Sequence, residues 1–231
     1  IDLAIARLRP PVHLEDIQHT PPIATHSDFP GKDVHWEGGQ GIHPHDLASD
    51  LFPAFVASLP QDQYRSGLAE AVKTALLYDE ELTAKLEATP KVLEDRTLPL
   101  VEEMIRICVS AKAAVVEQDL TEKNIRMQLN LGHTFGHALE TIAGLGTVSH
   151  GDAVAWGMAR AAVLSEQLGL CHSDFEDRVK RLLAGFGWET GCLHPALESR
   201  YEDRAQAARA LYEADPELRA AVEYHFFDDK N

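Results

Sequence analysis

The stretch HGDAVAWGMARAAVLSEQLGL, residues 150–170, is apolar or small on almost every side when it is read with a helical period. A helix at the surface of a protein carries a polar face, so a helix that is apolar all round is predicted to be buried. Gly169 suits the end of such a helix, because glycine adopts the left-handed conformation of a helix C-terminus readily. The stretch therefore predicts a buried helix.

Helical patterns also fill residues 58–88, 98–119, 174–187 and 201–227. The apolar positions in the first of them are Leu68, Val72, Leu76 and Leu82. Leu68, Val72 and Leu76 follow one another at a spacing of four residues, which places them on one face of a helix, and Leu82 continues the apolar pattern. The chain has no run of alternating strands and no internal repeat. We therefore expect a mainly α, multi-helix domain over residues 53–231.

Residues 1–52 differ in composition from the rest of the chain. They are rich in Pro, Gly and His and have no sustained helical or strand period. Scattered histidines could bind a metal, but this composition is more typical of an irregular arm. The segment WEGGQG lacks the preceding strand and following helix of a nucleotide-binding loop. We expect residues 1–52 to form an arm outside the helical domain.

Charge and cysteine content exclude several classes of function. The formal net charge is −16, which disfavours nucleic acid or an anionic membrane as a partner. A small anionic substrate remains possible if a few Lys and Arg side chains gather locally. No apolar run is long enough to span a bilayer, and the N-terminus does not resemble a signal peptide. Cys108, Cys171 and Cys192 form no zinc-ribbon or disulfide pattern, which favours a cytoplasmic location.

Some polar residues fall within the apolar helical stripes. Lys112 follows Val101, Ile105 and Cys108 along one stripe. It is either a lysine whose stem packs while its amine reaches water, or a cation directed into a cleft to hold an anion. Glu70 and Lys73 lie three residues apart and can form a solvated surface pair. Burial of any of these groups would require partners, so each is a candidate for function.

The stretch LNLGHTFGHALE, residues 129–140, contains two histidines four residues apart. If residues 126–142 are helical, Arg126, Asn130, His133 and His137 form one polar stripe. Glycines at 132 and 136 are poor helix formers and indicate that another part of the chain approaches the backbone closely.

A carboxylate and histidines on separate helices are a plausible catalytic zinc set. Glu70, His133 and His150 offer oxygen and nitrogen donors that suit Zn²⁺, and three protein ligands leave a position open for substrate. The alternative is a group of hydrogen-bonded histidines in the core. The histidine pair lacks the glutamate that follows the first histidine in the HExxH motif of metalloproteases.

Three motifs occur in order along the chain: SGLAEAVKTALLYD, KAAVVEQDLTEKNIRMQLNLGHTFGHALE and HGDAVAWGM. Together they resemble the C-terminal domain of 3-dehydroquinate synthases, in the sugar-phosphate cyclase family, from about Pro53 to the C-terminus. The resemblance implies a helical fold and a homodimer. Family members carry an NAD-binding α/β domain before this region, and residues 1–52 do not resemble it.

The resemblance also implies roles for individual residues. It makes Glu70, His133 and His150 the ligands of a catalytic Zn²⁺ or Co²⁺. The residues implied at the substrate are Lys73 at the ring hydroxyls, Lys112 and Arg126 at the carboxylate, Asn130, His137 and Lys230 at the phosphate, and Glu122 as a further acid near the site. Asp152 stands where the family usually has Glu, which keeps the charge but shortens the reach.

The implied reaction belongs to the shikimate pathway. It converts 3-deoxy-D-arabino-heptulosonate 7-phosphate to 3-dehydroquinate and phosphate, with NAD transiently oxidising a substrate hydroxyl. We expect this chain to bind about one zinc ion, to bind NAD weakly or not at all, and to need a nucleotide-binding domain for turnover. The alternatives are a related cyclase acting on a non-acid substrate such as sedoheptulose 7-phosphate, and a non-catalytic remnant.

Overall fold

The computed structural model describes residues 55–119, 125–144, 146–172, 174–198, 200–201, 203–216 and 219. The described residues form helices and no strand, which confirms the expected mainly α fold. The predicted arm, residues 1–52, lies outside them, so its separation from the helical domain stays a prediction. No helix within the described part is both long and apolar enough to cross a membrane.

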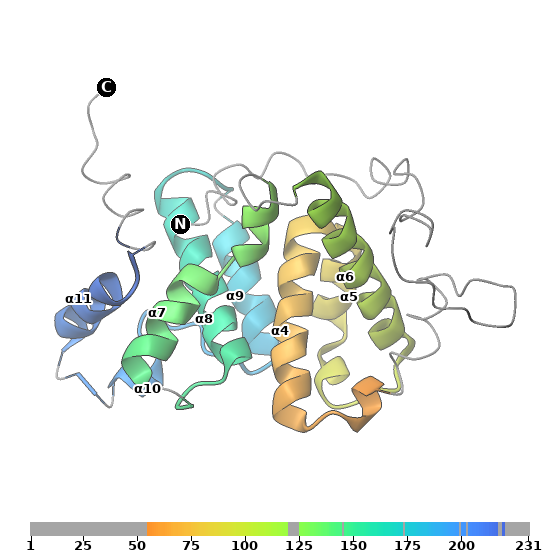
Figure 1. The fold of residues 1–231 in the computed structure, drawn as a ribbon, viewed down its shortest axis with the longest axis horizontal. Coiled ribbons are helices and arrows are strands. Elements are labelled where there is room, and N and C mark those ends of the chain that lie inside the picture. The colour runs from red at the N-terminus through yellow and green to blue at the C-terminus, as the bar shows by residue number, and fades with distance from the viewer. Residues whose placement is uncertain are drawn as a thin grey trace, which may run out of the picture.

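The helices follow one another with short connections (Figure 1). In chain order they are α4 (Gln61–Tyr78), α5 (Glu80–Ala88), the 3₁₀ turn η2 (Pro90–Leu93), α6 (Pro99–Gln118), the 3₁₀ turn η3 (Ile125–Asn130), α7 (His133–Ala143), α8 (His150–Gln167), α9 (Phe175–Gly185), α10 (Pro195–Glu198) and α11 (Arg204–Ala214).

The central helix is α8, which packs against α4, α7 and α9. Val154 and Met158 lie in a large core shared with α4, α5, α6 and α9. Trp156 lies in a smaller core with residues of α7 and α10. All three side chains are almost fully buried, and Gly169 has a φ of 66° just beyond the helix. The prediction of a buried helix that ends near Gly169 is confirmed.

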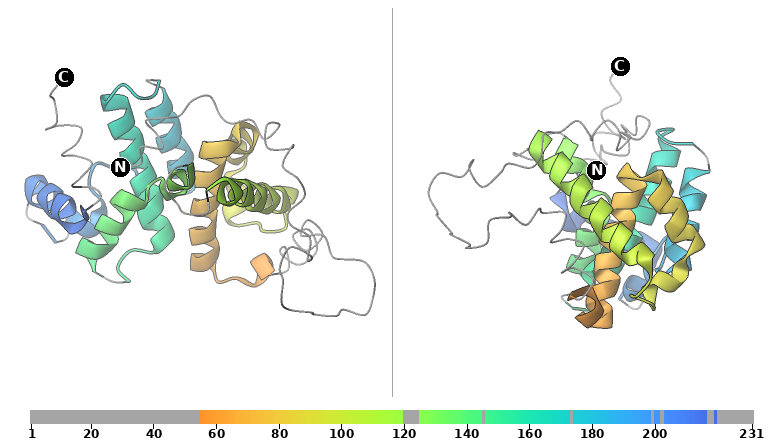
Figure 2. Two further views of the ribbon diagram at one scale, coloured as in Figure 1. Left: turned by 45° about the horizontal axis from the view of Figure 1, so that its top comes forward. Right: turned by 90° about the vertical axis from the view of Figure 1, so that its right-hand side faces the viewer.

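The helical pattern over residues 58–88 is interrupted, and two helices form in place of one. Asp79 leaves the helical conformation with φ −145° and ψ 96°, and its side chain accepts a hydrogen bond from the backbone nitrogen of Leu82 at 2.8 Å. An aspartate that caps a helix in this way offers the backbone an alternative to continuing the previous helix. Helix α6 then lies across α4 (Figure 2).

Helices α7 and α8 approach each other closely at glycines. A Cβ atom on Gly132 would lie 2.6 Å from the carbonyl oxygen of Val154, and one on Gly157 would lie 1.9 Å from the carbonyl oxygen of Gly132. The expectation of a close backbone approach is thus confirmed. The condition of one helix over residues 126–142 is not met, because Gly132 adopts a φ of 83° and α7 begins only at His133.

Candidate metal and substrate site

Three helices each bring one potential metal ligand to the same point. Glu70 lies in the middle of α4, His133 is the first residue of α7, and His150 is the first residue of α8. Glu70 Oε1 lies 3.6 Å from His133 Nε2 and 3.7 Å from His150 Nε2. Donors about 2.0–2.1 Å from a tetrahedral Zn²⁺ lie about 3.4 Å from one another. The three side chains therefore fit around one such ion with small adjustments.

The carboxylate of Glu70 has two different environments. Its Oε2 atom accepts a hydrogen bond from Lys73 Nζ at 2.5 Å. Its Oε1 atom is buried and accepts no hydrogen bond from the described residues. A buried carboxylate oxygen without a partner is costly unless a cation satisfies it. Lys73 is only 4% exposed, whereas 41% of the Glu70 side chain is exposed, so the pair is half-buried and is not the fully solvated surface pair that its spacing allowed.

The imidazole of His133 is neutral in this environment. Burial, and next the nearby Lys73 ammonium, lower the pKa of His133 to about 4. The Nδ1 atom of His133 faces the carbonyl oxygen of Leu131 at 3.4 Å, while Nε2 faces Glu70. A metal is ligated by neutral imidazole, through the lone pair of one ring nitrogen.

The start of α8 is fixed relative to α4. The side chain of Ser149 caps α8 by accepting a hydrogen bond from the backbone nitrogen of Asp152 at 3.1 Å. The Asp152 carboxylate accepts hydrogen bonds from Ser149 Oγ at 2.7 Å and from Arg65 Nε at 2.8 Å. Arg65 lies on α4, about one turn before Glu70. The aspartate at position 152 thus reaches its partners despite its short side chain, and it holds His150 near Glu70.

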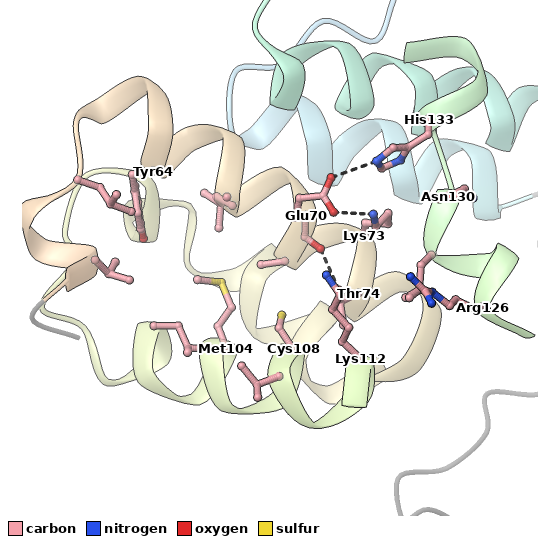
Figure 3. A pocket seen from close by; sticks show the side chains of 18 residues that line it. Tyr64, Glu70, Lys73, Thr74, Met104, Cys108, Lys112, Arg126, Asn130 and His133 are labelled. Atoms are coloured by element: carbon pink, nitrogen blue, oxygen red, sulfur yellow. Dashed lines mark hydrogen bonds and ion pairs between the residues drawn. The ribbon is translucent and has the colours of Figure 1, made fainter. Parts of the chain in front are cut away.

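A cavity of about 480 Å³ opens beside these residues, between α4, α6 and η3. Figure 3 shows Glu70, Lys73 and His133 gathered at one end, and Tyr64 and Met104 toward the other. We call the end with Glu70, Lys73 and His133 the polar end. It is also lined by Lys112, Arg126, Asn130 and Thr74. A small anion could bind at this end, while the apolar end would contact carbon atoms.

The cavity gathers six of the residues predicted from sequence. They are Glu70, Lys73, Lys112, Arg126, Asn130 and His133. Lys112 is exposed and also lines the cavity, and its role as a cation that holds an anion stays a prediction.

The structure places two other predicted residues outside the cavity lining, and two more fall outside the part of the chain that it describes. Among the described residues, His137 and His150 lie outside the cavity lining. His137 is exposed, and its ring centroid lies 5.3 Å from that of His133. Glu122 and Lys230 lie outside the described residues.

Two residues near the site were missed by sequence reasoning. Cys108 lines the cavity, and its sequence signal was read only as an apolar position on α6. Glu140 lies on α7 with its Oε1 atom 3.4 Å from His150 Nδ1. Its signal was its position seven residues after His133, which places both on one face of a helix.

Comparisons with known proteins point to one family. The family model described as 3-dehydroquinate synthase C-terminal matches residues 67–209. A 3-dehydroquinate synthase of Dehalococcoides mccartyi is 38% identical over 152 residues, which cover 66% of this chain and 42% of that protein. One of Geobacter metallireducens is 43% identical over 130 residues, which cover 55% of this chain and 36% of that protein. The chain therefore spans less than half the length of these relatives.

A solved structure resembles the fold. It is a 2-epi-5-epi-valiolone synthase from Streptomyces hygroscopicus subsp. jinggangensis with NAD⁺ and Zn²⁺ bound. The match has a TM-score of 0.58 and 28% sequence identity, and it covers 75% of this chain and 45% of that one.

Proposed function

The chain belongs to the family of 3-dehydroquinate synthase C-terminal domains, and on this premise we propose that it holds a zinc ion and a sugar-acid phosphate for a phosphate-eliminating cyclisation. The proposed reaction converts 3-deoxy-D-arabino-heptulosonate 7-phosphate to 3-dehydroquinate and phosphate. In this proposal the chain supplies the metal- and substrate-binding helices of a carbon–oxygen lyase.

The observation that carries the proposal is the convergence of three ligand atoms, two of them from residues that line the polar end of the cavity and the third from His150 beside it. Glu70 Oε1 is buried, accepts no hydrogen bond from the part of the chain that the structure describes, and faces the Nε2 atoms of His133 and His150. One carboxylate oxygen and two imidazole nitrogens are a donor set that Zn²⁺ and Co²⁺ both accept. When bound there, the ion would act as a Lewis acid toward substrate oxygens.

The chain's own side chains would bind and orient the substrate. Lys112 and Arg126 line the cavity from α6 and η3 and suit a carboxylate, which arginine can hold with two parallel hydrogen bonds. The ammonium group of Lys73 donates a hydrogen bond to Glu70 and would contact the ring hydroxyls of the substrate at the polar end of the cavity. Asn130 and His137 remain the proposed contacts of the phosphate. The apolar end of the cavity would limit the access of water to the reacting carbons.

We assign none of the described residues to NAD binding. Helices without any strand, as found over the described residues, provide no strand–turn–helix site for a dinucleotide. The hydride chemistry of such cyclases would therefore depend on residues other than those described. The homodimer implied by the resemblance likewise stays a prediction.

A second candidate function is a cyclase that acts on a non-acid sugar phosphate. The likeness to a 2-epi-5-epi-valiolone synthase favours it. Lys112 and Arg126 favour the acid substrate, because two cations at one end of a cavity suit a carboxylate. Binding of the two substrate types to the wild-type chain and to Lys112→Ala distinguishes the candidates. We expect Lys112→Ala to weaken binding of the acid sugar phosphate about 10-fold and to leave the non-acid one nearly unchanged.

The metal assignment is tested by zinc content. The wild-type chain is expected to retain about one zinc ion after dialysis, and His150→Ala is expected to lose it. His172→Ala is the matched control, because it removes an exposed histidine beyond the far end of α8. Equal zinc content in the wild type and His150→Ala would refute the ligand set.

A further inference from the structure

The two ring nitrogens of His150 face two different carboxylates. Nε2 lies 3.7 Å from Glu70 Oε1 on α4, and Nδ1 lies 3.4 Å from Glu140 Oε1 on α7. The ring therefore stands between two acids on separate helices. A neutral imidazole has one N–H donor and one lone pair, so the two nitrogens cannot serve both acids in the same way.

We infer that Glu140 is a positioning residue for the metal site. Its carboxylate accepts a hydrogen bond from the Nδ1–H group of His150, which leaves the Nε2 lone pair directed at the ion beside Glu70. Histidines that ligate metals usually donate their other N–H to a carboxylate, carbonyl or water, which fixes the tautomer and makes the ligand more basic. This inference rests on the proposed zinc site.

The fold explains why α7 can supply this acceptor. His133 and Glu140 are seven residues apart, so both side chains leave the same face of α7. A Cβ atom on Gly136 would lie 3.1 Å from the backbone of Ala153, so α7 runs against the first turn of α8. One helix thus carries a ligand of the ion and the acceptor for the other histidine.

The side chain of Glu140 is better shielded than that of His150, with 27% and 47% of the side chains exposed. The separation of 3.4 Å is a few tenths of an ångström beyond the usual hydrogen-bond range of about 2.7–3.2 Å. The hydrogen bond of this inference therefore requires the two side chains to come about 0.2 Å closer than they lie here. Partial burial strengthens such a bond, because less water competes for the carboxylate.

A rival role for Glu140 is as a ligand of a second cation, together with His137 and His150. One ligand atom from each of these residues falls within 4.8 Å of the others. That arrangement would need the Nδ1 lone pair of a ring whose Nε2 lone pair already faces Glu70. The ring would have to lose its last proton, which a hydrogen bond to Glu140 does not require. The geometry therefore favours the hydrogen-bond acceptor.

The test measures zinc affinity by competition with a chromophoric chelator. We expect Glu140→Ala to raise the zinc dissociation constant about 10–100-fold. The zinc dissociation constant of Glu140→Gln is expected to fall between those of Glu140→Ala and the wild type, because the glutamine amide oxygen accepts the hydrogen bond but carries no charge. Glu94→Gln, on an exposed glutamate at the end of η2, is expected to match the wild type.

A spectroscopic measurement separates positioning from a general structural effect. With Co²⁺ in place of zinc, the visible absorption bands report ligand geometry, and we expect them to shift in Glu140→Ala and to recover partly in Glu140→Gln. Since Gln is isosteric with Glu, it keeps the test informative if Glu140→Ala does not fold.

Three results would overturn the inference. Wild-type affinity and an unchanged cobalt spectrum in both Glu140 variants would show that Glu140 does not position His150. Two zinc ions in the wild type, with loss of only one in Glu140→Ala and in His137→Ala, would make Glu140 a ligand of a second ion. Absence of zinc from the wild-type chain would overturn the proposed function as well, which distinguishes the two failures.

Discussion

Replacement of Gly157 by alanine is predicted to destabilise the fold and to weaken metal binding together. Gly157 lies within α8, and alanine is preferred over glycine in a helix by about 1 kcal/mol, so helix propensity alone predicts a more stable protein. The added methyl group would lie 1.9 Å from the carbonyl oxygen of Gly132 and 3.0 Å from the amide nitrogen of Gly136. Both are backbone atoms, so no side-chain rotation relieves the clash.

The size of the required shift follows from these distances. Helices α7 and α8 must separate by about 1.5 Å before the methyl group reaches an ordinary van der Waals contact with that oxygen. Overpacking a dense core costs about 1–3 kcal/mol, and backbone contacts favour the upper end of that range. A cost of about 3 kcal/mol for overpacking, less the gain of about 1 kcal/mol in helix propensity, gives a net loss of stability of about 2 kcal/mol. His133 and His150 begin these two helices, and metal–ligand distances tolerate only about 0.2 Å.

Urea unfolding followed by circular dichroism gives the stability, and chelator competition gives the zinc affinity. Gly67→Ala is the matched control, because a Cβ atom on Gly67 in α4 would meet nothing within 4 Å. It is expected to stabilise the chain by up to about 1 kcal/mol. If Gly157→Ala proves as stable as Gly67→Ala and binds zinc as the wild type does, the argument from close helix packing is refuted.

Three further predictions concern single side chains. Burial raises the pKa of the Cys108 thiol to about 11, so iodoacetamide at neutral pH should label the exposed Cys192 well before Cys108, as measured by peptide mass spectrometry. Burial also raises the pKa of Tyr78 to about 12, above the value of about 10 in an unfolded chain. Deprotonation thus favours unfolding, and the stability that is intact below about pH 10 falls towards pH 12; Tyr78→Phe should flatten this decline in urea titrations. Asp79→Ala removes the cap of α5 and should cost about 1 kcal/mol in urea unfolding.

Each of these predictions has a contrary outcome. Equal labelling rates for Cys108 and Cys192 in the folded chain would show that burial does not protect Cys108. An equally steep alkaline decline in Tyr78→Phe would place its cause in other groups. Wild-type stability of Asp79→Ala would mean that the hydrogen bond from Leu82 contributes little to the start of α5.

The buried helix was predictable because its signal lies in composition. Residues 150–170 carry almost no polar face, and burial of the whole helix is the one way to remove such a surface from water. The two breaks in the helical patterns were harder to predict. Asp79 lies between apolar positions on both sides, and its side chain begins α5 by accepting a hydrogen bond from the backbone nitrogen of Leu82 where α4 ends. Gly132 takes a positive φ where α8 approaches, and this contact depends on the tertiary structure.

The residues of the candidate site that stand in sequence motifs could be predicted. Glu70, His133 and His150 stand in three separate motifs, and the structure brings them to one point. The spacing of Glu70 and Lys73 could not distinguish a solvated pair from a buried one, because burial depends on the packing of α4. Glu140 went unnoticed because its partner, His150, lies on a different helix.

The buried ammonium of Lys73 has a consequence for which cations this site can hold. It already offsets the charge of Glu70 through Oε2, so an arriving dication meets little net electrostatic attraction. Ca²⁺ and Mg²⁺ depend on several oxygen ligands or retained waters, and here they would find one available carboxylate oxygen beside two imidazoles. Zn²⁺ and Co²⁺ form strong bonds to imidazole nitrogen and lose less from the offset charge. We therefore expect Lys73 to make the proposed site selective for transition metals, because it removes the attraction on which hard cations rely.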